Sequence, residues 1–150
     1  DIDTKVVGYL RVSKAIAPHM KQLGWGRIIN IGGLAARSGG TISGMRNLAL
    51  THLTKTLSNE LGPYGINVNL VHPGATRTER TKPLQQKASE NEGVSIEEIE
   101  KRACVAVDVR RMIDASEVAN LVTFLASPLA SAITGEAIAT GGGVGSAVFQ

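Results

Sequence analysis

The sequence predicts an α/β fold, in which a parallel β-sheet carries α-helices on both faces. Helical and strand-like segments alternate along the chain, and this order is typical of parallel strands joined by right-handed helical crossovers. Hydrophobic residues make up 43% of the 150 residues and charged residues 19%, which is the balance of a globular domain. Aromatic residues are only 3%, so the core must be built from Ile, Val, Leu and Ala, as in helices packed on a buried sheet.

The first segments predict a helix, a buried strand and a loop. Apolar residues recur at helical spacing over residues 4–23, and Gly24 is a suitable stop. Pro18 lies inside this segment, so we expect a kink or an early end there. Residues 26–31 (GRIINI) predict a short buried strand, and the glycine-rich residues 32–40 predict a loop.

A long helix and a second strand follow. The helix is predicted from about Ser43 to Leu61, with Ser43 as its N-terminal cap and Gly62-Pro63 as its end. Residues 66–70 alternate apolar side chains with asparagine, which predicts a strand that ends where His72-Pro73-Gly74 begins. The apolar stripe of the helix is Met45, Ala49, Leu50, Leu53, Leu57 and Leu61.

The last part of the chain predicts a polar excursion, two helices and a final strand. Residues 75–94 are polar and irregular, and long excursions of this kind are functional lids or disordered segments. Ser95 with Glu98, and Asp114 with Glu117, form capping-box patterns that open the two helices. Residues 133–140 predict the last strand.

Several classes of function are disfavoured. The net charge of +3 is small, its basic residues are scattered and few aromatics are present, so we expect no nucleic-acid partner. A lone cysteine, Cys104, can form neither an internal disulfide nor a cysteine zinc site. We expect no metal, no membrane segment, no signal peptide and a cytoplasmic protein. The chain starts at Asp1, directly in a helical pattern, so we expect a piece of a longer protein.

The strand ends predict where the chemistry lies. In parallel sheets, ligands bind beyond the carboxyl ends of the strands. Here those ends are residues 32–40, 72–78 and 141–143, and all three are glycine-rich or proline-glycine loops. The candidate site is therefore expected where these loops meet.

The same loops resemble the carboxyl-terminal part of the short-chain dehydrogenase/reductase family, in the family's order and over nearly the whole chain. This resemblance implies a Rossmann-like, doubly wound parallel sheet, and a single partial nucleotide-binding domain over residues 1–150. The family's amino-terminal half, which carries the glycine-rich phosphate turn, is not in this sequence. The matching segments are Gly26–Arg37, Leu53–Asn69, His72–Thr78, Glu117–Ser127 and Ile133–Glu136, together with the helix at Asp3–Met20.

The resemblance also implies the catalytic positions, and all four are substituted. Family members use a serine, a tyrosine, a lysine and a supporting asparagine, and those positions fall on Gly33, Ser43, Asn47 and Lys5. The family's proton relay needs a phenol beside a cation, which these residues do not supply. Lys5 is otherwise a solvated helix residue. One alternative relay would take its hydroxyl from Ser38, Thr41 or Ser43 and its cation from Lys5 or Arg46.

The proline-glycine loop keeps more of the family pattern. The resemblance implies that Pro73, Gly74, Thr76 and Thr78 hold the nicotinamide carboxamide of NAD or NADP, although a plain turn also explains Pro-Gly. His72, just before this loop, is expected to be packed or solvent-facing and not catalytic. Residues 79–104 match the family's substrate lid.

Three functional hypotheses remain open. The first is an NAD(P)-dependent oxidoreductase acting on a small carbonyl compound or secondary alcohol, with non-standard or lost catalytic residues. The second is a non-catalytic binding or oligomerising scaffold, since the resemblance implies a homo-oligomer paired through the helices at 4–23 and 43–61. The third is a truncated remnant without a function of its own. Function depends on sites, so the fold does not choose among them.

Overall fold

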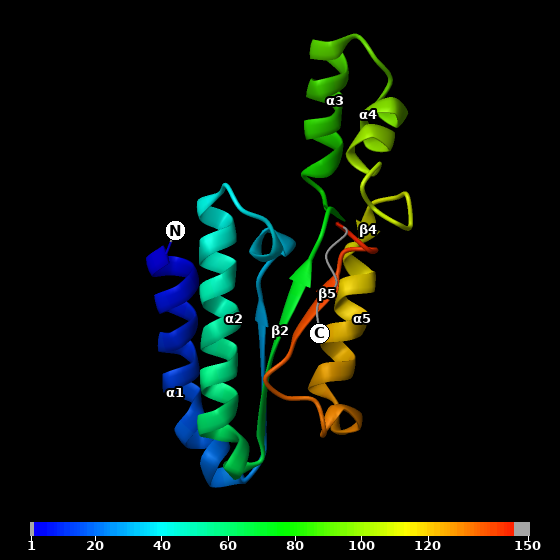
Figure 1. Ribbon diagram of the computed structural model, residues 1–150. Helices are drawn as coiled ribbons and strands as arrows, with labels where there is room; N and C mark the ends of the chain where they lie inside the picture. The colour runs from blue at the N-terminus through cyan, green and yellow to red at the C-terminus, as the bar shows by residue number, and fades with distance from the viewer. Residues whose placement is uncertain (1, 146–150) are drawn as a thin grey trace.

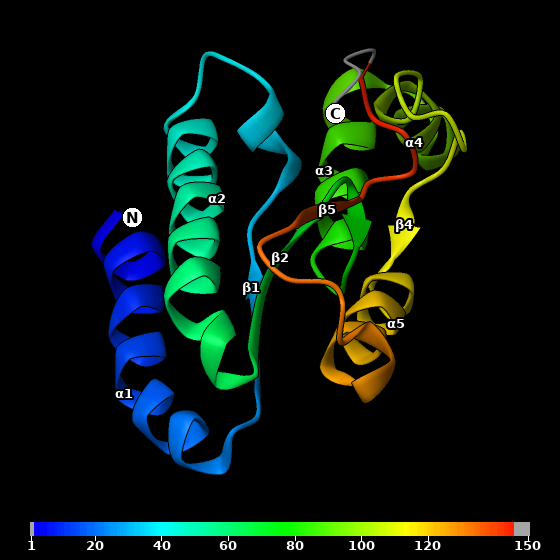
Figure 2. The same ribbon diagram turned by 60° about the horizontal axis from the view of Figure 1, so that its bottom comes forward.

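The computed structural model describes residues 2–145 and confirms the parallel α/β architecture. Three parallel strands form the central sheet in the order β1–β2–β5. Helices α1 and α2 cover one face of this sheet and α5 covers the other (Figure 1, Figure 2). The elements of this body are β1 (Gly26–Ile31), β2 (Ile66–Pro73), β5 (Ala137–Thr140), α1 (Gly8–Leu23), α2 (Ile42–Leu61) and α5 (Ala115–Ala126).

Two hydrophobic clusters hold these layers together, one on each face of the sheet. The first cluster centres on Ala17, Leu57 and Val68, and so joins α1 and α2 to the sheet. The second joins Val71 of β2 to Leu125 of α5. The central strand β2 is buried along almost its whole length, so its polar residues Asn67, Asn69 and His72 lie inside the fold together with its apolar ones.

The first helix agrees with its predicted range within one residue but is less regular than expected. It begins with a π-helical segment, Asp3–Val7, continues as α1 and runs through Pro18 without ending there. Proline removes one helical hydrogen bond, but Pro18 is exposed while its neighbour Ala17 is buried in the core and keeps the helix packed. Gly24 ends the helix in the left-handed conformation (φ +63°), as expected.

Helix α2 matches its predicted range within one residue, but its cap and its buried face differ. Thr41 is the N-cap, because its side chain accepts a hydrogen bond from the Gly44 amide. The expected cap at Ser43 is therefore wrong, and Ser43 lies inside the first turn. Met45 of the predicted stripe is 56% exposed. The buried face instead carries Gly44, Asn47, Leu50, Thr54, Leu57, Ser58 and Leu61.

Both later strands differ from their predicted limits. β2 does not stop before His72 but pairs with β5 as far as Pro73, whose missing N–H is tolerated at the last position of a strand. β5 begins at Ala137 and not at Ile133. The carbonyl of Ile133 instead accepts hydrogen bonds from the amides of Asn67 and Asn69, each at 2.8 Å, so this stretch is a side-chain-bonded turn.

The predicted irregular excursion is mostly helical. Helices α3 (Thr81–Glu92) and α4 (Ile96–Ala103) lie beyond the carboxyl end of β2 (Figure 1). Leu84 is one of few apolar residues in α3, so hydrophobic periodicity gave no helical signal. Two short parallel strands, β3 (Thr76–Arg77) and β4 (Ile113–Asp114), connect this helical pair to the body.

Candidate functional site

A cleft of about 520 Å³ lies where the three strand-end loops meet. The first loop contributes Gly33 and Leu34, the second contributes Pro73 and Gly74, and the third contributes Val144. Ala103 and Val107, from the end of α4 and the segment after it, line the cleft as well. The first two predicted loops therefore border one cleft, and the third reaches it through Val144, just after the predicted residues 141–143. The volume is in the range of small-molecule pockets.

The loops approach each other so closely that the cleft wall requires glycine. A Cβ atom on Gly74 would lie 2.7 Å from the Cα of Gly141, and one on Gly141 would lie 2.1 Å from a methyl of Leu34. Real Cβ atoms do not approach other atoms so closely, so backbone packs directly against backbone here. Residues of three distant segments thus form one continuous surface.

Gly33 has both of its backbone groups bound inside the protein. Its N–H donates to Nδ1 of His72 at 2.9 Å, and its carbonyl accepts from the side-chain amide of Asn47 at 3.2 Å. The two residues at the family's serine and lysine positions are therefore brought together. A Cβ atom on Gly33 would lie 2.9 Å from the Asn47 amide nitrogen, so a serine cannot be accommodated while Asn47 keeps this position.

His72 continues this hydrogen-bond set into α2. Its Nε2 lies 3.2 Å from the Thr51 hydroxyl, which in turn donates to the backbone carbonyl of Asn47 at 3.2 Å. Since Nδ1 accepts from Gly33, the proton of the neutral ring resides on Nε2 and points to Thr51. The four residues thus form a closed ring of hydrogen bonds, which we call the Gly33 clamp: Gly33, Asn47, Thr51 and His72.

The surroundings of His72 favour its neutral form. The side chain is 2% exposed, and burial lowers its pKa below the usual 6.5, with the Arg37 guanidinium acting in the same direction. A neutral ring is the state that can accept from Gly33, so electrostatics and geometry agree.

The other candidates for a proton relay come from α2 and from the first helix. Ser43 accepts a 3.5 Å hydrogen bond from Arg46, so one expected hydroxyl–cation pair does come together. Lys5 is half-buried, not solvated as expected, and its ammonium lies 5.8 Å from the centre of the Tyr9 ring. The Tyr9 hydroxyl donates to the Ile31 carbonyl at 2.9 Å. None of these four side chains (Ser43, Arg46, Lys5 and Tyr9) lines the cleft.

The proline-glycine loop is held by local hydrogen bonds. The Thr76 hydroxyl donates to the Gly74 carbonyl at 3.1 Å, and the Thr78 amide donates to the Thr81 hydroxyl at 3.0 Å. Pro73 and Gly74 line the 520 Å³ cleft, whereas Thr76 and Thr78 line a neighbouring cavity of about 420 Å³ beneath α3 and α4. The four predicted cofactor residues are therefore divided between two adjoining cavities.

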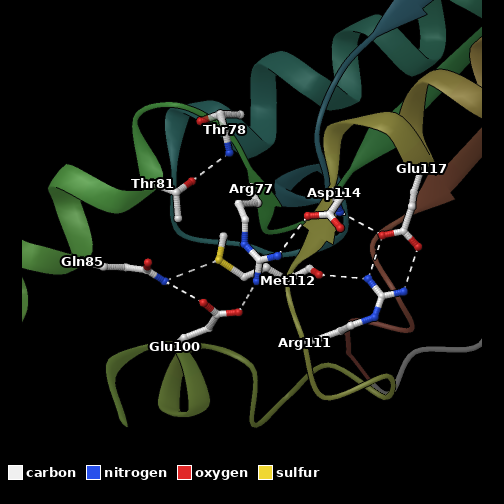
Figure 3. A network of polar contacts seen from close by, with 9 residues as sticks. All are labelled: Arg77, Thr78, Thr81, Gln85, Glu100, Arg111, Met112, Asp114 and Glu117. Atoms are coloured by element: carbon white, nitrogen blue, oxygen red, sulfur yellow. Dashed lines mark hydrogen bonds and ion pairs between the residues drawn. The ribbon is translucent and has the colours of Figure 1, made fainter. Parts of the chain in front are cut away.

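A chain of charged contacts joins the helical pair to the body of the fold (Figure 3). Arg77 bridges Glu100 of α4, at 2.5 Å, and Asp114, at 3.0 Å. Asp114 caps α5 together with Glu117, as predicted, and Arg111 binds Glu117 through both of its terminal nitrogens. This pairing with Arg111, helped by the Asp114 backbone N–H, lowers the pKa of Glu117 to about 2.

Some features of this site escaped the sequence analysis. The Arg77 contacts and the Thr51 hydroxyl were not singled out, and Asn47 was considered only as a substituted lysine. One signal was present: His72, Thr51 and Asn47 are polar residues within otherwise apolar, periodic segments. Polar groups buried in such positions are hydrogen-bonded as a rule, although their partners cannot be read from spacing.

Residues 2–145 contain neither a metal-ion cluster nor a membrane-spanning helix. In that range, no group of three or more His, Cys, Asp or Glu side chains could hold a metal ion. No helix in the same range is long and apolar enough to cross a bilayer. Cys104 is buried, and burial raises the pKa of its thiol.

Comparison with known proteins identifies relatives of the whole arrangement. Residues 1–145 match the family model described as enoyl-(acyl carrier protein) reductase. The NADPH-dependent reductase BacG of Bacillus subtilis is 35% identical over 142 residues, which are 93% of this chain and 55% of BacG. The short-chain reductase protein NovJ of Streptomyces niveus is 34% identical over 144 residues, which are 95% of this chain and 53% of NovJ.

A solved structure supports the same assignment. The crystal structure of YwfH, an NADPH-dependent reductase involved in bacilysin biosynthesis, superposes with a TM-score of 0.87 and 32% identity, covering 98% of this chain and 57% of that one. The chain thus spans about half the length of the relatives it matches. With its parallel sheet, its strand-end cleft and its match to the family model, the chain belongs to the short-chain dehydrogenase/reductase family.

Proposed function

We propose that this chain forms the nicotinamide-end and lid portion of an NAD(P)H-dependent reductase that acts on a small carbonyl compound or secondary alcohol. The cleft at the carboxyl ends of the parallel strands carries this proposal, because it is the place where such sheets bind ligands. BacG and YwfH are named as NADPH-dependent reductases, which favours the reduced phosphorylated dinucleotide as the first cofactor to test.

The cleft residues suit the flat nicotinamide ring. Leu34, Val107 and Val144 supply apolar surface, while Gly74 contributes backbone without a side chain of its own. When bound, a reduced nicotinamide supplies a hydride. The contribution of this chain is to orient the ring and to exclude water from it.

The residue at the family's ribose-binding position fits the nicotinamide ribose less well. Asn47, at the position where the family places lysine, is 4% exposed and its amide is already bonded to Gly33. It carries no charge with which to hold a ribose or lower the pKa of a neighbouring hydroxyl. We therefore infer that proton delivery does not follow the family's usual relay through Gly33, Ser43, Asn47 and Lys5, and that the Ser43–Arg46 pair is the alternative to test.

The direct experiment is a titration of NADPH and NADH with this chain, followed by cofactor fluorescence. Ala106 lines the cleft and is exposed, whereas its neighbour Val105 is 62% exposed and does not line it. Ala106→Trp should fill the cleft and abolish saturable binding, while Val105→Trp should leave binding intact. Equal binding by both variants would place the dinucleotide elsewhere.

The second candidate is a scaffold that assembles without catalysis, and one observation favours it. Large apolar side chains are exposed on α1 and at the start of α2, among them Val12 (69%), Met45 (56%) and Leu48 (58%). Exposed apolar surface of this kind marks association surfaces. A homo-oligomer in sedimentation, dispersed by Val12→Lys, together with saturable dinucleotide binding but no turnover on a panel of carbonyl compounds, would support the scaffold.

We further propose that residues 1–150 are one partial domain and that the protein is cytoplasmic, as the single buried thiol suggests. A truncated remnant would show neither a folded core nor saturable binding. Cooperative thermal unfolding of the purified chain would argue against it.

A further inference from the structure

The Gly33 clamp supports an inference that goes beyond the proposed reductase function. Only the effect of the clamp on dinucleotide binding rests on that function. We propose that His72 is a positioning residue that fixes the Gly33 peptide, and that Gly33 and Asn47 are a matched pair that must be exchanged together. Where the family has a serine side chain, the clamp places a backbone segment whose N–H and carbonyl are both hydrogen-bonded.

Two consecutive glycines, Gly32 and Gly33, fit tightly against the buried side chains of the clamp. A Cβ atom on Gly32 would lie 2.7 Å from His72 Nδ1, and one on Gly33 would lie 2.9 Å from the Asn47 amide nitrogen. Both His72 and Asn47 are at least 95% buried, so neither can swing into solvent to make room. The two glycines therefore match the two polar side chains that contact them.

The hydrogen bonds of the clamp follow one another in a single donor-to-acceptor direction. Every donor in the clamp has one acceptor: Gly33 N–H to His72, His72 Nε2–H to Thr51, Thr51 to the Asn47 carbonyl, and the Asn47 amide to the Gly33 carbonyl. Only the neutral ring with its proton on Nε2 satisfies this order. The four hydrogen bonds of the clamp thus connect the loop after β1 to the end of β2 and to α2.

The position of the clamp gives it a role in binding. Gly33 and Leu34 line the cleft, whereas His72 and Thr51 line a separate cavity of about 400 Å³ behind it. His72 therefore acts from behind the wall, through Gly33, and does not touch a ligand in the cleft. It is a positioning residue and not a catalytic one.

The first test reads the clamp without any cofactor. In the ¹⁵N-labelled chain at pH 7, the ring nitrogens of His72 should show a bare Nδ1 and a protonated Nε2, and the Gly33 amide should be protected from exchange. His72→Asn keeps an acceptor near the Nδ1 position and should preserve the protection, whereas His72→Ala should abolish it. A proton on Nδ1, or unchanged protection in His72→Ala, would overturn the proposal.

The second test addresses the matched pair with a double-mutant cycle. Gly33→Ser should lower the melting temperature in the wild-type background and lower it less when Asn47→Ala has removed the clashing amide. Gly39→Ser is the matched control, because a Cβ atom there would meet nothing within 4 Å, and it should have no effect. Equal effects of Gly33→Ser in both backgrounds would refute the pairing.

The third test links the clamp to the proposed function. His72→Ala should weaken NADPH binding by about ten-fold, roughly the value of one lost hydrogen bond, and His72→Asn should restore most of it. Wild-type affinity in His72→Ala would contradict the positioning role. If the wild-type chain binds no dinucleotide at all, the reductase proposal fails, and the first two tests still decide on the clamp.

Discussion

Asn67 offers the sharpest stability prediction, because one buried side chain holds the turn that leads into β5. Its amide donates to the carbonyls of Ser131 and Ile133 at 2.9 and 2.8 Å, with a weaker contact to Ala130 at 3.3 Å. Its oxygen accepts from Arg27 at 3.2 Å. The side chain is 8% exposed, so water cannot easily replace these partners.

Asn67→Ala removes two well-formed hydrogen bonds and leaves the Ser131 carbonyl without a partner, whereas the Ile133 carbonyl keeps the bond from Asn69. Each lost hydrogen bond contributes about 1 kcal/mol, and the Ser131 carbonyl costs about 1 kcal/mol more because this exposed residue can be rehydrated, so we expect a loss of about 3 kcal/mol in the free energy of unfolding. For a chain of this size that corresponds to a fall of roughly 6–12 °C in Tm. Urea titration and thermal unfolding measure both quantities.

Two further variants make this prediction specific. Asn67→Asp keeps the acceptor that faces Arg27 but turns a carboxylate oxygen toward carbonyl oxygens, so it should be more destabilising than Asn67→Ala. Asn59→Ala, at an exposed position of α2, should change the stability by less than about 0.5 kcal/mol. An Asn67→Ala protein as stable as the Asn59→Ala control would refute the assignment of these bonds.

Four other outcomes are expected. Thr41→Ala should cost about 1 kcal/mol because Thr41 caps α2, and Ser43→Ala should cost less; the reverse order in urea titrations would restore the Ser43 cap. Because burial lowers the pKa of His72 below 6.5, the unfolded chain binds the proton first, so stability should fall as pH drops below 6.5; His72→Asn should flatten this slope. Glu117, with its pKa lowered from 4.5 to about 2, contributes stability above pH 4.5 that is lost as pH falls toward 2, and acid titration of Glu117→Gln should lack this component. Cys104 is 2% exposed with a raised thiol pKa, so maleimide should label it slowly in the folded chain and rapidly in urea; fast labelling of the folded chain would contradict its burial.

The sheet and its main helices were predictable because their signals are local. The helix over residues 43–61 shows regular apolar spacing and a Gly62-Pro63 stop, and both reflect the geometry of one helix against one face. The strand-end rule then located the cleft, since it depends only on strand direction. These are properties that a segment carries by itself.

The remaining features depend on contacts between distant segments. Helix α3 carries little hydrophobic pattern, and it packs on α4 while Arg77 holds α4 through Glu100. The clamp joins Gly33 to Asn47 and His72, which lie 14 and 39 residues away along the chain. No sequence periodicity encodes such a bond. The choice of Thr41 instead of Ser43 as the N-cap of α2 likewise depends on how the preceding loop approaches the helix.

Methyl-labelled NMR of the chain during an NADPH titration shows whether the dinucleotide binds in the strand-end cleft. We predict that the methyl resonances of Leu34, Val107 and Val144, which line the cleft, shift together and saturate, while those of exposed Val12 and Leu23 stay in place. Saturating shifts at Val12 or Leu23 with no change at the cleft methyls would contradict it.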